Sequence, residues 1–179
     1  MIEEIEYKLL IKALAFAADK HRNQRRKNVD ASPYINHPIS LASILCNEAH
    51  ITDLNVICGA LLHDTVEDTE TTEEELVAEF GQEISSIVME VTDDKTIEDK
   101  QKRKQLQIEH AAHISTSAKL IKLADKISNL RDVANDPPAN WNRDRKREYF
   151  DWAKQVIDQV RSVHSGLEVL FDEAYSERV

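Results

Sequence analysis

Residues 57–70 read I-C-G-A-L-L-H-D-T-V-E-D-T-E, and this stretch changes from apolar to acidic without a spacer. The run from Ile57 to Leu62 is built for burial, whereas His63, Asp64 and the acids at positions 67 and 68 follow at once. Carboxylates this close repel one another, and burial beside an apolar run raises that cost. A metal cation would remove the repulsion by supplying positive charge. The stretch therefore indicates either a helix end with solvated acids or a metal site.

The rest of the chain has the hydrophobic spacing of helices. We expect helices at about residues 5–26, 39–49, 52–62, 84–91, 117–136 and 144–172. Strand-like alternation is scarce, so an all-α fold is predicted. With 179 residues, the chain is long enough for one domain with a real core, and we expect a single domain over residues 1–179.

Local signals place several helix boundaries. Thr52 is the expected N-cap of the helix that carries the apolar run. Thr72 and Glu75 form a capping box for a further helix, which would stop at Gly81. The pair Pro137-Pro138 ends the helix that begins near residue 117, because proline cannot continue a helix.

Composition narrows the class of protein. The hydrophobic content of 41% and charged content of 31% are ordinary for a globular protein. The net charge of −10 argues against a general nucleic-acid binder, which usually carries a basic surface. No signal peptide or stretch of about 18 apolar residues is visible, so we expect no membrane partner. Cys46 and Cys58 lie in apolar stretches and are expected to be reduced core residues in a cytoplasmic protein.

Two further residues extend the cluster at the end of the apolar run. His37 lies in Y-I-N-H-P, a bend fixed by proline, and Asp125 lies on an otherwise apolar helical face. A buried bare carboxylate is costly, so Asp125 needs a partner. With His63 and Asp64, these residues make a set of two histidines and two aspartates. Nitrogen and oxygen ligands without thiolate suit manganese, iron or zinc.

Positions 63–68 are read as continuous helix. His63 and Glu67 are then four residues apart, as are Asp64 and Asp68, so each pair shares a face. Glu67 and Asp68 would lie one turn beyond the candidate ligands, on the side that faces the ion.

Four sequence motifs, in this order along the chain, resemble those of a known family: Y-I-N-H-P, A-L-L-H-D-T-V-E-D, V-T-D-D-K-T and K-L-A-D-K-I-S-N-L-R-D. They resemble the HD-domain metal-dependent phosphohydrolases and, more selectively, the hydrolase domains of the RelA/SpoT alarmone enzymes of the stringent, or starvation, response. The stand-alone animal members are the nearest match. The resemblance covers about residues 8–172 and implies a helical HD fold. It also implies one Mn²⁺ ion held by His37, His63, Asp64 and Asp125.

The same resemblance implies an enzyme. Its substrate would be guanosine 3′,5′-bis(diphosphate) (ppGpp), cleaved to GDP and pyrophosphate. Glu67 and Asp68 match the catalytic acidic pair of the family, and the sequence does not say which is the base and which the acid. Two alternatives stay open. One is removal of the 2′-phosphate of NADPH at the same metal site, and the other is a sensor that binds a nucleotide without cleaving it.

The resemblance also implies contacts to a small-molecule nucleotide. The substrate-binding residues would be Arg26, Lys27, Asn129 and Tyr149, with Lys95 and Lys102 as further candidates. The segment 97–104 departs from the family pattern, so its lysines cannot be placed on family contacts. The oligomeric state is left open.

Overall fold

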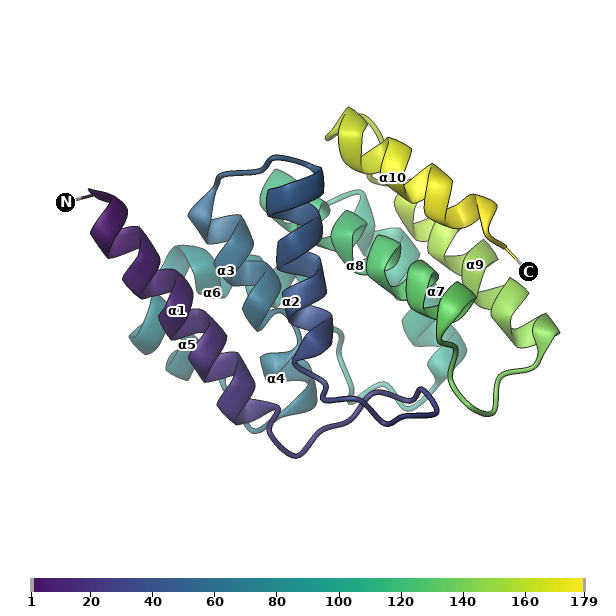
Figure 1. Ribbon diagram of the computed structural model, residues 1–179, viewed down its shortest axis with the longest axis horizontal. Helices are drawn as coiled ribbons and strands as arrows, with labels where there is room; N and C mark the ends of the chain where they lie inside the picture. Colours follow the sequence, from purple (N-terminus) through teal and green to yellow (C-terminus); the bar gives the residue numbers. More distant parts are fainter. Residues whose placement is uncertain (1, 179) are drawn as a thin grey trace.

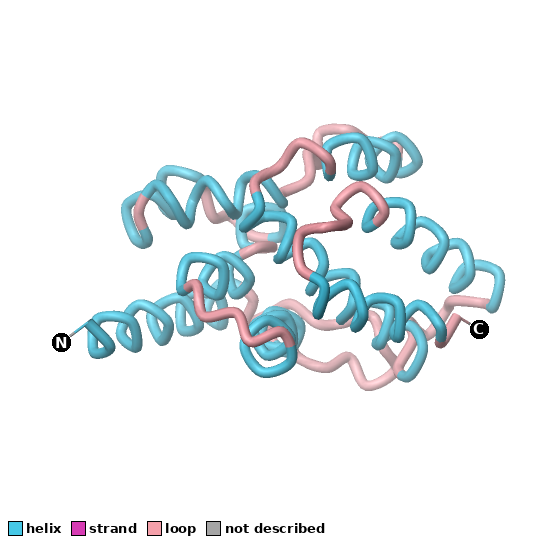
Figure 2. The backbone as a smooth tube through the Cα atoms, turned by 90° about the horizontal axis from the view of Figure 1, so that it is seen from above, coloured by secondary structure: helices cyan, strands magenta, loops and turns pink. Residues whose placement is uncertain are grey.

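The computed structural model describes the backbone of residues 2–178 and the side chains of residues 6–178. Every regular element in this range is a helix, and Figure 2 shows helices joined by loops. The described residues contain no strand, only an isolated bridge between Arg25 and Pro33. The all-α prediction is therefore confirmed. No described helix combines the length and apolar composition needed to cross a membrane.

The helices divide the molecule into two ends and a centre. In chain order they are α1 (Ile2–Lys20), α2 (Asn36–Ser43), the π-helical turn η1 (Ile44–Glu48), α3 (Leu54–Leu62), α4 (Thr65–Asp68), α5 (Glu73–Phe80), α6 (Gln82–Val91), α7 (Lys100–Ala111), α8 (Thr116–Asn135), α9 (Arg143–Ile157) and α10 (Ser165–Ser176). Helices α1 and α5 lie at one end and α9 and α10 at the other, with α2, α3 and α8 between them (Figure 1).

Helix α3 is buried on all sides because α1, α2, α6 and α8 pack around it. Its residues 56–62 are all buried. Val56 and Ala60 belong to one hydrophobic cluster of the core, and Cys58, Leu61 and Leu62 belong to the other. A helix that is apolar all round belongs in such a position. Gly59 permits the close approach, because a Cβ there would lie 2.9 Å from Ile121 Cδ1 and 3.0 Å from Ile87 Cγ2. The apolar run thus holds its polar end at the centre of the molecule.

Residues 63–68, which follow the apolar run, do not form a continuous helix, so that prediction is wrong. Helix α3 ends at Leu62, His63 is its C-cap, and Asp64 has φ −100° and ψ 0°. The short helix α4 then begins at Thr65, whose hydroxyl donates to the Leu62 carbonyl oxygen at 2.7 Å. The turn at Asp64 changes the direction of the chain between the candidate ligands and the candidate catalytic pair.

Several helix boundaries differ from expectation. Asp53, not Thr52, caps α3, since its carboxylate accepts from the backbone N–H groups of Asn55 and Val56. The expected helix over 144–172 is two helices, because the chain leaves α9 at 157 and Ser162 adopts a positive φ of 73°. Apolar residues continue across this break, so hydrophobic spacing alone did not reveal it.

Other local predictions are confirmed, although the capping box forms only in part. The Thr72 side chain accepts from the Glu75 backbone N–H at 3.2 Å, and α5 ends at Phe80 before Gly81, which has a φ of 83°. Helix α8 stops at Asn135, just before the proline pair. Cys46 and Cys58 are both free, as expected, but only Cys58 is buried in the core and Cys46 is half-buried.

Candidate metal centre and adjoining cavity

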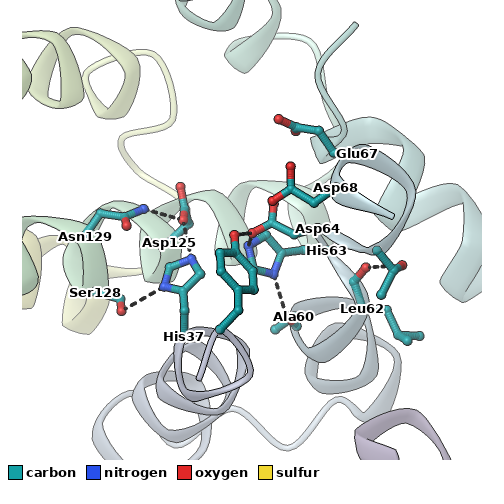
Figure 3. A network of polar contacts seen from close by, with 12 residues as sticks. His37, Ala60, Leu62, His63, Asp64, Glu67, Asp68, Asp125, Ser128 and Asn129 are labelled. Atoms are coloured by element: carbon teal, nitrogen blue, oxygen red, sulfur yellow. Dashed lines mark hydrogen bonds and ion pairs between the residues drawn. The ribbon is translucent and has the colours of Figure 1, made fainter. Parts of the chain in front are cut away.

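Three helices bring two histidines and one aspartate together. His37 lies in the first turn of α2, His63 caps the C-terminus of α3, and Asp125 lies in the middle of α8. One possible ligand atom from each residue lies within 4.8 Å of the other two. His37 Nε2 is 3.2 Å from Asp125 Oδ1, and Figure 3 shows both imidazoles turned toward this point. The three side chains form a candidate metal centre.

Each histidine is oriented through its other ring nitrogen. His37 Nδ1 lies 3.3 Å from the Ser128 hydroxyl, and His63 Nδ1 lies 2.8 Å from the Ala60 carbonyl oxygen (Figure 3). A carbonyl can only accept, so it places the proton on Nδ1 of a neutral His63 and leaves Nε2 as the lone-pair nitrogen. That Nε2 atom is buried and has no hydrogen-bond partner among the described residues. An orphaned nitrogen beside a carboxylate fits a divalent cation, which takes such ligands.

Asp64, the fourth expected ligand, lies at the edge of this group rather than within it. Its Oδ2 accepts a short hydrogen bond from the Tyr34 hydroxyl. The same oxygen is 2.8 Å from His63 Nε2, although the geometry is not that of a hydrogen bond. The assignment of Asp64 as a ligand stays a prediction, supported by this short distance to the candidate centre.

The electrostatics of the centre favour a cation. Burial lowers the pKa of His63, but the carboxylates of Asp64 and Asp125 and the Ala60 carbonyl together outweigh burial and raise that pKa to about 9. The pKa of Asp125 is well below its ordinary value despite burial, because Lys126 and His37 lie beside it. The C-terminus of α3, where His63 lies, adds the negative end of a helix dipole. In the metal-free protein, the proton on His63 supplies positive charge beside the carboxylates. Metal binding would replace this proton, because the cation supplies the charge instead.

Two cavities meet at this centre. The smaller, of about 170 Å³, is lined by His37, His63, Asp64, Glu67, Asp93, Gln107, Lys122, Asp125 and Lys126, among others. The larger, of about 650 Å³, has the volume of a small-molecule binding site. Four residues line both: Arg26, Tyr34, His37 and Asn129. A ligand in the larger cavity can therefore reach the candidate metal centre.

The two acids of α4 face different cavities. Glu67 lines the smaller cavity, where its Oε2 accepts from the Asp93 backbone N–H at 3.1 Å. Burial, followed by the charge of Asp93, raises the pKa of Glu67 to about 7. Asp68 lines the larger cavity and is already paired, since Gln24 donates to its Oδ2 at 2.8 Å and Lys95 contacts its Oδ1. Glu67 is therefore the acid with a titration near neutral pH.

We predict that Glu67→Gln stabilises the metal-free protein above pH 7. Glu67 stays protonated in the folded chain up to about pH 7 but ionises near 4.5 when unfolded. Its contribution to stability is thus complete below about pH 4.5 and lost as the pH rises through 7. At about 1.36 kcal/mol per pKa unit, the shift from 4.5 to about 7 corresponds to a loss of about 3 kcal/mol. Urea unfolding with a chelator at pH 5 and pH 8 measures it.

The matched control is Glu109→Gln on α7, at an exposed position. The free energy of unfolding of this variant should follow that of the wild type at both pH values. The difference in the free energy of unfolding between Glu67→Gln and the wild type should grow from pH 5 to pH 8. An unchanged difference would show that Glu67 is already ionised in the folded, metal-free state at pH 5.

The structure brings four of the six expected substrate-binding residues to the larger cavity. Its lining residues include Arg26, Lys27, Asn129 and Tyr149. Lys95 and Lys102 line neither cavity. The Lys95 ammonium is half-exposed and contacts Asp68, and Lys102 is exposed in the first turn of α7. The roles of all six in substrate binding stay predictions.

Sequence reasoning missed residues that the structure places in the site. Tyr34 lines both cavities and donates a hydrogen bond to Asp64, and its ring centroid lies 5.7 Å from the Arg26 guanidinium. Lys122 and Lys126 are buried on the α8 face that carries Asp125. A signal for the lysines was present, because Lys122 lies three residues before Asp125 and four before Lys126 in an otherwise apolar segment, where lysine is uncommon.

Comparison with known proteins places this fold and site in a family. The family model described as HD domain matches residues 13–153. The chain belongs to the HD domain family. Members of this family bind divalent metal ions, and the cluster of His37, His63 and Asp125 is the matching feature of this chain. The identity of the metal is a separate question.

Similar HD domain proteins include named enzymes. Guanosine-3′,5′-bis(diphosphate) 3′-pyrophosphohydrolase MESH1 of Xenopus tropicalis is 51% identical over 170 residues, covering 95% of this chain and 94% of that protein. The MESH1 protein of Homo sapiens is 50% identical over 169 residues, with 94% of each chain covered. The solved structure of a metazoan ortholog of SpoT that hydrolyzes ppGpp and plays a role in starvation responses matches with a TM-score of 0.91. It is 48% identical and covers 95% of both chains.

Proposed function

We propose that this HD domain protein hydrolyses the 3′-diphosphate of ppGpp to GDP and pyrophosphate, with Mn²⁺ at the candidate centre. The observation that carries the proposal is the junction of the two cavities. His37 and Asn129 line both the 170 Å³ and the 650 Å³ cavity, so a group bound at these residues lies where the two cavities meet. A reacting phosphate at the centre and a nucleoside beside it would fit this arrangement. The names of the similar enzymes support the same substrate.

The larger cavity offers the groups that a charged nucleotide needs. Arg26 and Lys27 supply positive charge for phosphate groups. Tyr149 and Trp141, whose ring centroids lie 5.3 Å apart, supply aromatic surface for a base or sugar. Arg26 is held ready by Asp132, 2.5 Å from its guanidinium, and by the Asn129 amide oxygen at 3.3 Å.

The protein's own acids would handle the protons of the reaction. Glu67 has a pKa near neutral pH, so it can accept a proton from the attacking water and later release it. Asp68 lines the larger cavity and is held in place by Gln24 and Lys95, and it would position the leaving group of the substrate. His37, His63, Asp64 and Asp125 would hold Mn²⁺, whose ligands are nitrogen and oxygen. When bound, the cation supplies a nucleophile near neutral pH and balances phosphate charge.

Identification of the products with two nucleotides tests this proposal. The purified, Mn²⁺-loaded protein is incubated with ppGpp or NADPH. The products are separated by chromatography and identified by mass spectrometry. We expect GDP and pyrophosphate from ppGpp, with a higher kcat/KM than for NADPH. Faster removal of the 2′-phosphate of NADPH would assign the same site to the second substrate. Binding of both nucleotides without turnover would indicate a sensor.

A further inference from the structure

A buried lysine faces the candidate metal centre without a partner. Lys122, on α8, is 9% exposed and lines the 170 Å³ cavity together with His63 and Asp125. Among the described residues, its ammonium makes no hydrogen bond and has no carboxylate oxygen within 4.0 Å. A buried ammonium normally has a partner, because an unpaired charge is costly to remove from water. The neighbouring lysine of the same helix face follows that rule, since Lys126 Nζ is 2.9 Å from Asp125 Oδ2.

The acids that lie around Lys122 are committed to other groups. Glu67 accepts from the Asp93 backbone N–H at 3.1 Å, and the Asp93 carboxylate accepts from the Gln107 amide. Asp125 accepts from Asn129 at 2.6 Å. These acids act on Lys122 from a distance, and binding of a divalent cation would cancel the charge of Asp125. The ammonium then faces the cavity with still less compensation.

The cavity has room for more than a metal ion. A single water requires about 10–15 Å³ of such space, whereas this cavity measures about 170 Å³. A second polar atom in its wall, Gln107 Oε1, is also buried and has no hydrogen-bond partner. The cavity wall thus presents the Lys122 ammonium and the Gln107 Oε1 acceptor, and one bound ligand could contact both. An ion with a tetrahedral phosphoryl group, which carries negative charge and can carry a bound proton, supplies both partners.

We propose that Lys122 forms a phosphoryl-binding subsite, in which its ammonium contacts the phosphate group that lies at the metal centre. The inference rests on the proposed function for the identity of the substrate, but the subsite itself concerns any phosphate anion. Lys122 adds a positive charge on the α8 side of the reacting group, whereas Lys27 lines the larger cavity and Arg26 lines both. Its contact would strengthen as charge develops on the phosphoryl oxygens during cleavage.

Titration of inorganic phosphate into the Mn²⁺-loaded protein tests the subsite without any nucleotide. The variant is Lys122→Met, which keeps the length of the side chain and removes the charge. We expect phosphate binding, measured by calorimetry, to weaken by at least about tenfold, as for the loss of a charge-assisted hydrogen bond. Metal content should equal that of the wild type. The Tm of the phosphate-free variant should not fall, because the cost of burying the Lys122 ammonium exceeds its distant attraction to Asp93, Asp125 and Glu67.

Lys119→Met is the matched control, since Lys119 lies one turn earlier on α8 and lines neither cavity. It should bind phosphate as the wild type does. Equal phosphate affinity of Lys122→Met and wild type, or a lower Tm with unchanged affinity, would overturn the proposal and make Lys122 a structural residue. Absence of phosphate binding by the wild type would overturn it as well. Failure of the wild type to cleave ppGpp, with phosphate binding that depends on Lys122, would reject the proposed substrate and leave the subsite standing.

Discussion

His63→Ala is expected to lower turnover of ppGpp by about 10³-fold and to weaken Mn²⁺ binding by more than about 100-fold. Loss of an outer partner of a metal ligand already costs about 10–100-fold in affinity, so loss of the ligand itself costs more. A catalytic metal ion contributes several kcal/mol, and about 1.4 kcal/mol corresponds to a factor of ten in rate. Calorimetric titration of metal and initial rates at saturating metal measure the two effects separately.

This variant removes one of the three clustered ligand atoms. It also removes the hydrogen bond to the Ala60 carbonyl oxygen and the positive charge beside Asp64, so the Tm of the variant is measured with its metal affinity. His113→Ala, at an exposed position after α7, is the histidine control and should retain metal affinity and rate. A His63→Ala protein that binds Mn²⁺ as tightly as the wild type would remove His63 from the ligand set.

Glu67→Gln is expected to lower kcat by about 10²–10⁴-fold while Mn²⁺ stays bound. General acid–base groups contribute this much to rate. Glutamine keeps the acceptor for the Asp93 backbone N–H, so the geometry around the side chain is preserved while the proton acceptor is lost. The same substitution should stabilise the metal-free protein above pH 7, as argued from its raised pKa. Loss of activity with a gain of stability is the signature of a residue kept for catalysis.

Asp68→Asn is the comparison that separates the two acids. Asp68 lines the larger cavity and contacts Lys95 and Gln24. Its replacement should affect KM more than kcat, because those contacts position the substrate side of the site. Equal losses of kcat in the two variants would show that the acids act as one unit, and a larger loss for Asp68→Asn would reverse the assignment of the base.

Some local predictions failed where a tertiary contact competed. The capping box of α5 formed in half: Thr72 accepts from the Glu75 backbone N–H, but the Glu75 carboxylate pairs with Lys20 of α1 at 2.7 Å. Similarly, hydrophobic spacing continued through residues 158–164, yet the chain turns there so that α10 can pack along α8. His164 caps the new helix by accepting from the Leu167 backbone N–H at 3.1 Å.

The expected placement of the two candidate catalytic acids depended on a continuous helix, and the structure corrects that placement. On such a helix, Glu67 and Asp68 would both follow one turn after their ligands. The turn at Asp64 instead starts α4 in a new direction, and the two acids reach different cavities. A backbone break of one residue carries no strong sequence signal here, because threonine and aspartate are found both in helices and at their ends.

The sequence by itself determined the all-α class, most helix positions and the residue types of the candidate centre. These follow from local physics: helical spacing of apolar residues, capping groups and prolines act within a few positions of the chain. Only the tertiary structure decided that His37, His63 and Asp125 meet, that Asp64 lies at the edge of their group, and that Lys122 faces them. It also left Lys102 outside both cavities. The physical reason is that cavities and charge partners depend on how distant helices pack.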